Sequence, residues 1–405
     1  MASNIRKVGL WLGVLILSLL LLPQAVAENV ATELTGEITF RGTDTNQLRR
    51  LTDGSVKKYY EGKRNKENWI EMDAPKGQKI HTLYLIWKSE TSPVSLEVWE
   101  KGDWSQVRLV NDGGYLHEVV RLAGGAERVR LRSTSKVGAI PVLELRAFSE
   151  GELPGDVQEW QESCTEADIL VLVAHPDDEY LFLGGTIPWY AMEEHRHVAV
   201  AYMTVKEDLR YHELLNGLWT AGVREYPYML GFYDKLSYEL KYIYKYWGED
   251  QALDKVARLI ETTRPQVVIT QGLLGEYGHA GHQAVADLCV RLIRDGERNM
   301  SWQPKKLYLH MNKENPISMD WSRTVTEDPE HRTALEIARD AFHCHASQVG
   351  FSQKIHWGPN KGKMFKFEVV EGGYMDNAAF GLVYSAVGPD DALDDFLEHI
   401  PQREE

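Results

Sequence analysis

The chain is poor in cysteine and in positive charge, and each shortage narrows the range of possible proteins. Its 405 residues include three cysteines, Cys164, Cys289 and Cys344, without any CxxC spacing, so a cysteine-based zinc site is not supported. One disulfide and three free buried thiols both remain open. The 45 lysines and arginines face 60 acidic residues, and a net charge of −15 argues against a nucleic-acid partner.

Long apolar runs are also scarce, and the one present lies at the N-terminus. Arg6 and Lys7 precede the apolar segment 8–22, and Ala25-Val26-Ala27 follows as a cleavage-site pattern. This predicts a signal peptide over 1–27 and a secreted or extracytoplasmic protein. The alternative is an uncleaved membrane anchor, because the run is nearly long enough to span a bilayer. We expect membrane contact through this segment or not at all.

Residues 28–150 carry the pattern of an all-β domain. Apolar and polar residues alternate in short runs, such as 82–87, 94–99 and 128–132, with glycine-containing turns between them. Runs of this kind at this spacing are typical of an antiparallel sandwich. The segment 151–165, which begins Gly-Glu-Leu-Pro-Gly, is expected to be a linker.

The pattern changes after residue 166. The continuous apolar run 169–174 is typical of a strand that is buried on both faces. Further strands are expected at 198–205, 267–270 and 307–310, alternating with helices at 185–196, 211–221, 251–263 and 283–294. This order predicts an α/β domain over 166–400, with a Rossmann-like, mostly parallel sheet and helices on both faces.

Two loops with histidines and carboxylates follow predicted strands of this domain. One contains His175, Asp177 and Asp178, and the other contains His279 and His282. In such sheets, ligands bind at the carboxyl ends of the strands, so the two loops are expected to meet. Two histidines and one carboxylate are a common zinc set that leaves room for water, and a further carboxylate can act as general base. The pattern indicates metal-assisted amide hydrolysis.

The first loop reads Ala-His-Pro-Asp-Asp-Glu over 174–179, which resembles the signature of the PIG-L/LmbE-like zinc de-N-acetylases. The segments 204–207, 210–213, 277–282 and 345–348 resemble later motifs of that family in the same order, so the resemblance covers roughly residues 165–400. It implies a Rossmann-like catalytic domain. It also implies removal of an N-acetyl group from an N-acetylglucosamine-type sugar in a glycoconjugate or glycan.

The resemblance also implies a role for single residues. His175, Asp178 and His282 would hold Zn²⁺, or another divalent metal. Asp177 would be the general base, with His279 as oxyanion donor or acid for the leaving amine. It further makes Tyr277 an oxyanion donor and Arg210 a substrate contact. Lys206 does not match the family motif, and we expect it to contact substrate as well.

This sequence departs from the family pattern at two of these motifs. Gly281 stands where many members have an aspartate, and Lys206 stands where a glycine is usual. The aromatic insert 226–247 is expected to cap the site, although a surface packing role is the alternative. Two other functions remain open: a catalytically silent glycan-binding protein, and a zinc amidase or esterase that acts on another acylated molecule.

The N-terminal region resembles a galactose-binding-like (discoidin-type) jelly roll. This resemblance is based on the turn Leu51-Thr52-Asp53-Gly54 and the segment Trp69-Ile70-Glu71-Met72. The resemblance implies carbohydrate binding. Packing against the catalytic domain is an equal alternative, because fold alone does not determine function.

Overall fold

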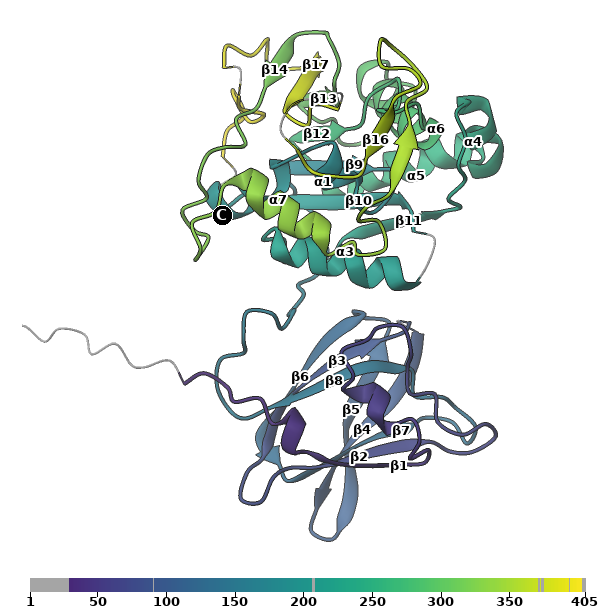
Figure 1. The fold of residues 1–405 in the computed structure, drawn as a ribbon, viewed down its shortest axis with the longest axis vertical. Coiled ribbons are helices and arrows are strands. Elements are labelled where there is room, and N and C mark those ends of the chain that lie inside the picture. Colours follow the sequence, from purple (N-terminus) through teal and green to yellow (C-terminus); the bar gives the residue numbers. More distant parts are fainter. Residues whose placement is uncertain are drawn as a thin grey trace, which may run out of the picture.

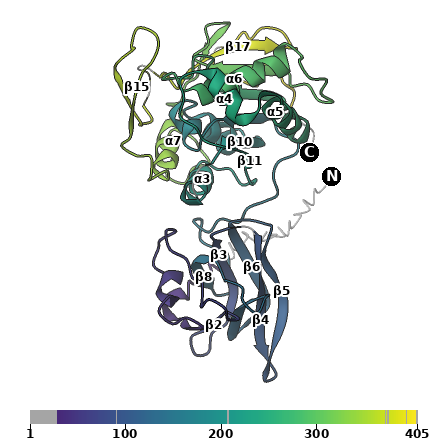
Figure 2. The ribbon, with the colours of Figure 1, turned by 90° about the vertical axis from the view of Figure 1, so that its right-hand side faces the viewer.

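The computed structural model describes residues 29–89, 91–205, 208–370, 372, 375–392 and 394–402. The predicted signal peptide and Lys206 lie outside the described residues. Within the described ranges, no helix has the length and apolar character needed to cross a membrane. The chain forms an all-β unit and an α/β unit, which are joined by a single connecting segment (Figures 1 and 2).

The all-β unit is an antiparallel sandwich, as its alternating sequence predicts. One sheet has the order β1-β2-β7-β4-β5 and the other β6-β3-β8. Apolar residues such as Leu83, Leu96 and Leu131 are fully buried between the sheets. The strands are β1 (Thr39–Gly42), β2 (Trp69–Asp73), β3 (Ile80–Trp87), β4 (Thr91–Glu100), β5 (Asp103–Asp112), β6 (His117–Ala126), β7 (Arg128–Ser133) and β8 (Val142–Phe148), with short helices at Thr35–Glu37 and Leu48–Leu51.

The α/β unit is built on a seven-stranded sheet with the order β11-β10-β9-β12-β13-β17-β14. The first five strands in that order are parallel, whereas β17 pairs antiparallel with both β13 and β14. The mostly parallel sheet is therefore confirmed. Its strands are β9 (Ile169–Val173), β10 (Val198–Thr204), β11 (Tyr228–Phe232), β12 (Val267–Thr270), β13 (Lys306–His310), β14 (Pro316–Ser318) and β17 (Ala379–Ser385).

Helices cover both faces of this sheet, which explains the unbroken apolar sequence of β9. Ile169 and Val171 pack in one buried cluster, and Leu170 and Leu172 in another. The first face carries α1 (Asp178–Leu181), α2 (Thr186–Pro188), the π-turn Trp189–Glu193, α3 (Asp208–Thr220) and α7 (Ala334–His343). The second carries α4 (Leu240–Trp247), α5 (Glu249–Thr263), α6 (Ala280–Cys289) and the π-turn Val290–Arg294 (Figure 2). A hairpin of β15 (Ser352–Lys354) and β16 (Met364–Lys366) stands apart from the sheet.

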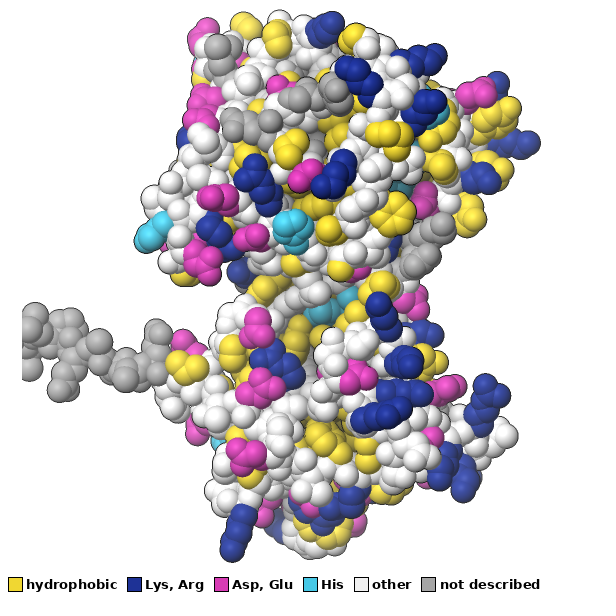
Figure 3. Space-filling view, in the orientation of Figure 1, with side chains coloured by type: hydrophobic (Ala, Val, Ile, Leu, Met, Phe, Trp, Pro, Cys, Tyr) yellow, Lys and Arg dark blue, Asp and Glu magenta, His cyan; other side chains and the backbone are white. Residues whose placement is uncertain are grey.

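The two units are in direct contact. One continuous cluster of buried apolar residues contains members of both, among them Leu85 of β3 and Leu214 of α3. At the same boundary His117 Nε2 lies 3.0 Å from His212 Nδ1, and both side chains are buried. Figure 3 shows hydrophobic and histidine side chains at this waist.

The three cysteines are free thiols, so the disulfide alternative does not hold.

Candidate metal centre

The carboxyl edge of the sheet brings the two predicted loops together. Residues 174–178 follow β9, and Asp178 is the first residue of α1. Residues 271–282 follow β12, and His279 caps the N-terminus of α6, where its Nδ1 accepts the Gly281 N–H at 3.1 Å. The two strands are adjacent and parallel, so the loops leave the sheet side by side.

The three predicted ligands converge on one point. Asp178 Oδ2 lies 3.0 Å from His175 Nδ1 and 3.4 Å from His282 Nε2. Tetrahedral zinc with bonds near 2.0–2.1 Å holds its donor atoms roughly 3.3 Å apart, so this spacing suits a divalent cation. All three side chains are buried, and His282 Nε2 has no hydrogen-bond partner in the described part of the chain. A buried ring nitrogen without a partner is the expected form of a metal ligand.

His279 lies in the same cluster but has different surroundings. Ligand atoms of His175, His279 and His282 all lie within 4.8 Å of one another. Burial, with the charges of His175 and His282, holds the pKa of His279 well below its ordinary value, so the ring is neutral. Because Nδ1 accepts from Gly281, the proton of the neutral ring is on Nε2. His279 can therefore donate a hydrogen bond into the site.

A buried carboxylate supports His282 from behind. Glu276 Oε2 lies 2.5 Å from His282 Nδ1, and Oε1 lies 3.0 Å from His310 Nδ1 and accepts the Gly272 N–H at 2.8 Å. Burial raises the pKa of Glu276, but the two histidines outweigh it and bring the pKa to about 2. Such a carboxylate fixes the ring orientation and the tautomer of a ligating histidine. Sequence reasoning missed both Glu276 and His310.

Asp177 has a strained backbone and a buried carboxylate. Its φ of 104° lies in the region that glycine favours, and its N–H donates to Glu179 Oε2 at 2.8 Å. Glu179 also accepts from Tyr202 Oη at 2.7 Å, so its carboxylate ties this loop to β10. Burial raises the pKa of Asp177 to about 7, although the nearby charge of Arg210 lowers it. A carboxylate with such a pKa is suited to proton transfer near neutral pH.

Arg210 reaches the site, but its guanidinium is already engaged. Its Nη2 lies 3.2 Å from Asp177 Oδ2 and also donates to the carbonyl of Pro176. Because of these contacts, we interpret Arg210 first as a group that positions Asp177. Its predicted contact with substrate stays a prediction.

The site opens into a cavity of about 160 Å³. Asp234 and Leu236 of the aromatic insert line it, so this insert reaches the site as expected. Phe351 and Phe367, which flank the β15–β16 hairpin, line another part of it, and the sequence did not predict this wall. The predicted residues in the lining are His175, Asp177, Asp178, Arg210, Tyr277 and His279.

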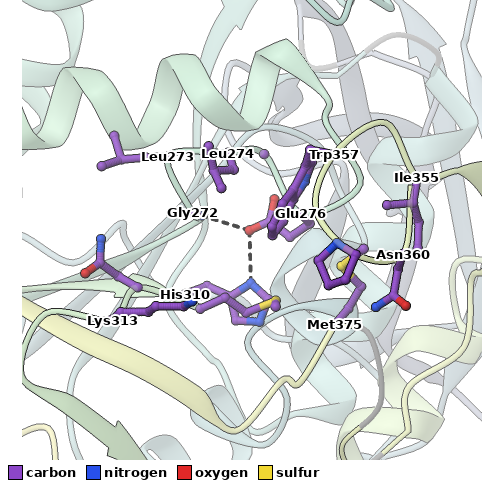
Figure 4. A pocket seen from close by; sticks show the side chains of 14 residues that line it. Gly272, Leu273, Leu274, Glu276, His310, Lys313, Ile355, Trp357, Asn360 and Met375 are labelled. Carbon is purple, nitrogen blue, oxygen red and sulfur yellow. Dashed lines mark hydrogen bonds and ion pairs between the residues drawn. The ribbon is translucent and has the colours of Figure 1, made fainter. Parts of the chain in front are cut away.

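A larger cavity of about 580 Å³ is lined by the 272–276 loop (Figure 4). Leu274, Ile355 and Met375 give it an apolar lining. Figure 4 shows the contact between Glu276 and His310 within this cavity. The carboxylate that holds His282 thus also lines the larger cavity.

Comparison with known proteins agrees with this arrangement. Residues 170–293 match the family described as "PIG-L: GlcNAc-PI de-N-acetylase". This stretch is a PIG-L domain. It contains the three predicted ligands together with Asp177, Tyr277 and His279, so the sequence resemblance is confirmed.

Two curated relatives match in the same region. A 1D-myo-inositol 2-acetamido-2-deoxy-alpha-D-glucopyranoside deacetylase 1 of Frankia casuarinae is 25% identical over 39% of this chain and 66% of its own length. The corresponding deacetylase of Nocardiopsis dassonvillei is 28% identical over 34% of this chain and 61% of its own length. The chain thus spans less than two thirds of each of these relatives.

Solved structures resemble each unit of the chain. The conserved protein TT1542 from Thermus thermophilus covers 45% of this chain and 80% of its own, with 18% identity and a TM-score of 0.34. The family 32 CBM of Clostridium perfringens NanJ, solved in complex with galactose, covers 29% and 99%, with 14% identity and a TM-score of 0.25. Likenesses of this degree have no bearing on function.

Proposed function

We propose that this protein is a metal-dependent hydrolase that removes the acetyl group from an N-acetylglucosamine-type amino sugar. The main support is the position of Asp178 Oδ2 within 3.4 Å of nitrogens on His175 and His282. The PIG-L domain and the names of its curated relatives point to the same chemistry. We infer further that the sugar belongs to a glycoconjugate or glycan outside the cytoplasm and that the metal is zinc.

The side chains around the ligands divide the reaction between them. A divalent cation held by the three ligands would supply Lewis acidity for amide hydrolysis. Asp177 would accept a proton from the attacking water, because burial raises its pKa to about 7, which is close to the pH of a neutral solution. His279 Nε2–H and Tyr277 would donate to the developing oxyanion. Arg210 would hold the Asp177 carboxylate in place through their ion pair.

Asp177→Asn tests this assignment. We expect kcat for acetate release to fall roughly 10²–10⁴-fold, because the amide cannot accept the proton. Metal content, measured by elemental analysis, should not change, since Asp177 is not among the three ligands. Asp250→Asn is the control, because that side chain is 91% exposed. Full activity in Asp177→Asn would contradict the mechanism.

A chelator and a panel of acylated amines separate this proposal from its alternatives. A silent glycan-binding protein would bind sugars but release no acetate before or after zinc is added. An amidase or esterase of another class would release its acid from a different acylated compound and leave N-acetylglucosamine derivatives intact. The proposed enzyme should release acetate from the amino sugar, lose this activity with chelator and regain it with zinc.

A further inference from the structure

A second group of metal-binding side chains lies at the amino edge of the parallel sheet, opposite the catalytic site. Its members are Cys164, His197 and Glu225, which precede β9, β10 and β11 respectively. These three strands are neighbours in the sheet, so the residues that precede them meet at one edge. The catalytic ligands His175 and His282 instead belong to the loops that follow β9 and β12.

The three side chains hold their donor atoms close together. A sulfur of Cys164, a ring nitrogen of His197 and a carboxylate oxygen of Glu225 all lie within 4.8 Å of one another. Donor atoms around a tetrahedral zinc ion are roughly 3.3–3.6 Å apart, so the widest pair has to approach by at most about 1.3 Å. The His197 side chain is 63% exposed and can make this movement by rotation of its ring.

Hydrogen bonds between the segments fix the backbone around this group. The Asp168 N–H donates to the His197 carbonyl at 2.9 Å, and the His197 N–H donates to Asp168 Oδ2 at 3.1 Å. Gln161 and Glu225 form a parallel bridge, which joins the connecting segment to the residues before β11. Because the backbone is already ordered, only side chains have to settle when an ion binds.

All three side chains line one cavity of about 510 Å³. The described lining of this cavity contains more negative than positive side chains, namely Glu162, Glu166, Asp168 and Glu225 against Arg196. A recess lined mainly by one sign of charge raises the local concentration of ions of the opposite sign. The cavity also gives an ion access to Cys164, which is otherwise buried.

The types of donor atom determine which class of ion fits. A thiolate is a soft ligand that favours zinc-like ions, whereas calcium and magnesium prefer oxygen ligands. One thiolate, one imidazole and one carboxylate leave a fourth tetrahedral position for water. The missing CxxC spacing argues against a site built from cysteines alone, but it cannot reveal ligands that come from three separate segments.

We propose that Cys164, His197 and Glu225 bind a second, structural divalent cation of the zinc type. The ion would fasten the end of the segment that joins the two units (Figure 2) to the starts of β10 and β11. The thiol would release its proton to solvent on binding. This inference does not rest on the proposed deacetylase function. The rival interpretation is that His197 and Glu225 form an ion pair beside a thiol that binds no metal.

Cobalt tests this site, because Co²⁺ can take the place of zinc and reports directly on sulfur ligation. A Co²⁺–thiolate bond gives a near-ultraviolet charge-transfer absorption, which the nitrogen and oxygen ligands of the catalytic site cannot produce. Titration of the full chain should give this absorption in wild type and also in D178N, which lacks a catalytic ligand. C164S should lose the absorption completely and bind one Co²⁺ fewer per chain. H197Q should weaken the affinity of this site at least about tenfold.

C344S and H343Q are the matched controls and should keep the wild-type absorption and affinity. Cys344 is half-buried and His343 is exposed, and neither belongs to the proposed ligand group. Urea unfolding with chelator present should be the same for C164S and wild type, which would show that the lost absorption is not a loss of fold.

The remaining outcomes each contradict the proposal. An absent charge-transfer absorption in wild type with excess Co²⁺, or an absorption that persists in C164S, overturns the site. Wild-type affinity in both H197Q and E225Q would mean that the thiol holds the ion without these two ligands. If C164S does not fold, H197Q decides the question, since its side chain is exposed and an unchanged affinity there refutes the site. None of these measurements depends on acetate release.

Discussion

Glu276 shows how much a single residue behind the ligands can determine. Its carboxylate holds His282 at 2.5 Å and His310 at 3.0 Å, and it is fully enclosed by the protein. This contact fixes the direction in which His282 Nε2 points toward Asp178, because the ring cannot rotate without breaking the hydrogen bond between Nδ1 and Glu276. Orientation of the ligand and its basicity therefore both come from one side chain.

Glu276→Gln is expected to weaken metal binding roughly 10–100-fold, because a neutral amide is a poorer acceptor for the His282 N–H. Competition with a chromophoric chelator measures the affinity directly, without reference to catalysis. Glu239→Gln is a suitable control, since that carboxylate is exposed and pairs with Lys241 at the surface. Equal affinities for Glu276→Gln and wild type would remove Glu276 from the support of the site.

At this scale, the sequence predicts residues that form short motifs and misses their distant partners. His175, Asp178 and His282 could be named because two compact loops follow strands of one sheet. Glu276 is adjacent to a motif, but its partner His310 is 34 residues further along the chain. The spacing of residues along the sequence does not show the contact between Glu276 and His310. It also does not show the ion pair between Arg210 and Asp177.

Among the elements, α7 depends on a visible local signal. Thr333 accepts the Glu336 N–H, and the Glu336 side chain returns to the Thr333 N–H, which together form a capping box. The helix buries Ala338 and Phe342 in the cluster shared with α3. Its start is therefore fixed by two reciprocal hydrogen bonds and its position by packing.

Thr333→Ala should reduce the free energy of unfolding by about 1 kcal/mol, because one N-terminal amide of α7 loses its acceptor. Urea unfolding followed by circular dichroism measures the change. Thr52→Ala, at an exposed position outside any helix, is the matched control. Equal loss in both variants would show that the capping box adds nothing to stability.

Strands that are buried at every position were predicted within a few residues. β12 has the predicted bounds, and β9 differs by one residue, because burial on both faces leaves an unbroken apolar run. The hairpin of β15 and β16 was missed, since three-residue strands are too short to show a period of two. The predicted helix at 283–294 instead begins at Ala280, where the His279 cap fixes its first turn.

For the whole molecule, the contact between the two units contains a pH-sensitive pair. His117 lies 2.7 Å from Tyr84 Oη and 3.0 Å from His212. Burial lowers the pKa of His212 to about 4, and burial together with His212 lowers that of His117 well below its ordinary value. Both rings are neutral in the folded protein at neutral pH.

Acidification should therefore destabilise the folded chain. An unfolded histidine takes up a proton near pH 6.5, whereas folded His212 does so only near pH 4, so stability falls as the pH drops through this window. When the pH falls from above 6.5 to below 4, the shifted pKa of His212 lowers the free energy of unfolding by about 3 kcal/mol. Urea unfolding at pH 7 and pH 5 should show a smaller pH dependence in His212→Gln than in wild type. His343→Gln, at an exposed position, should keep the wild-type dependence, and an unaltered slope in His212→Gln would refute the assignment.

The buried cluster that crosses the boundary between the units has a consequence for dissecting the protein. Sequence composition marks residues 151–165 as a place to separate two modules, but Leu85 and Leu214 belong to one apolar interior. A fragment that begins after this segment would present to water the surface that the sandwich covers. The linker is thus a boundary of composition, whereas the buried apolar cluster extends across it.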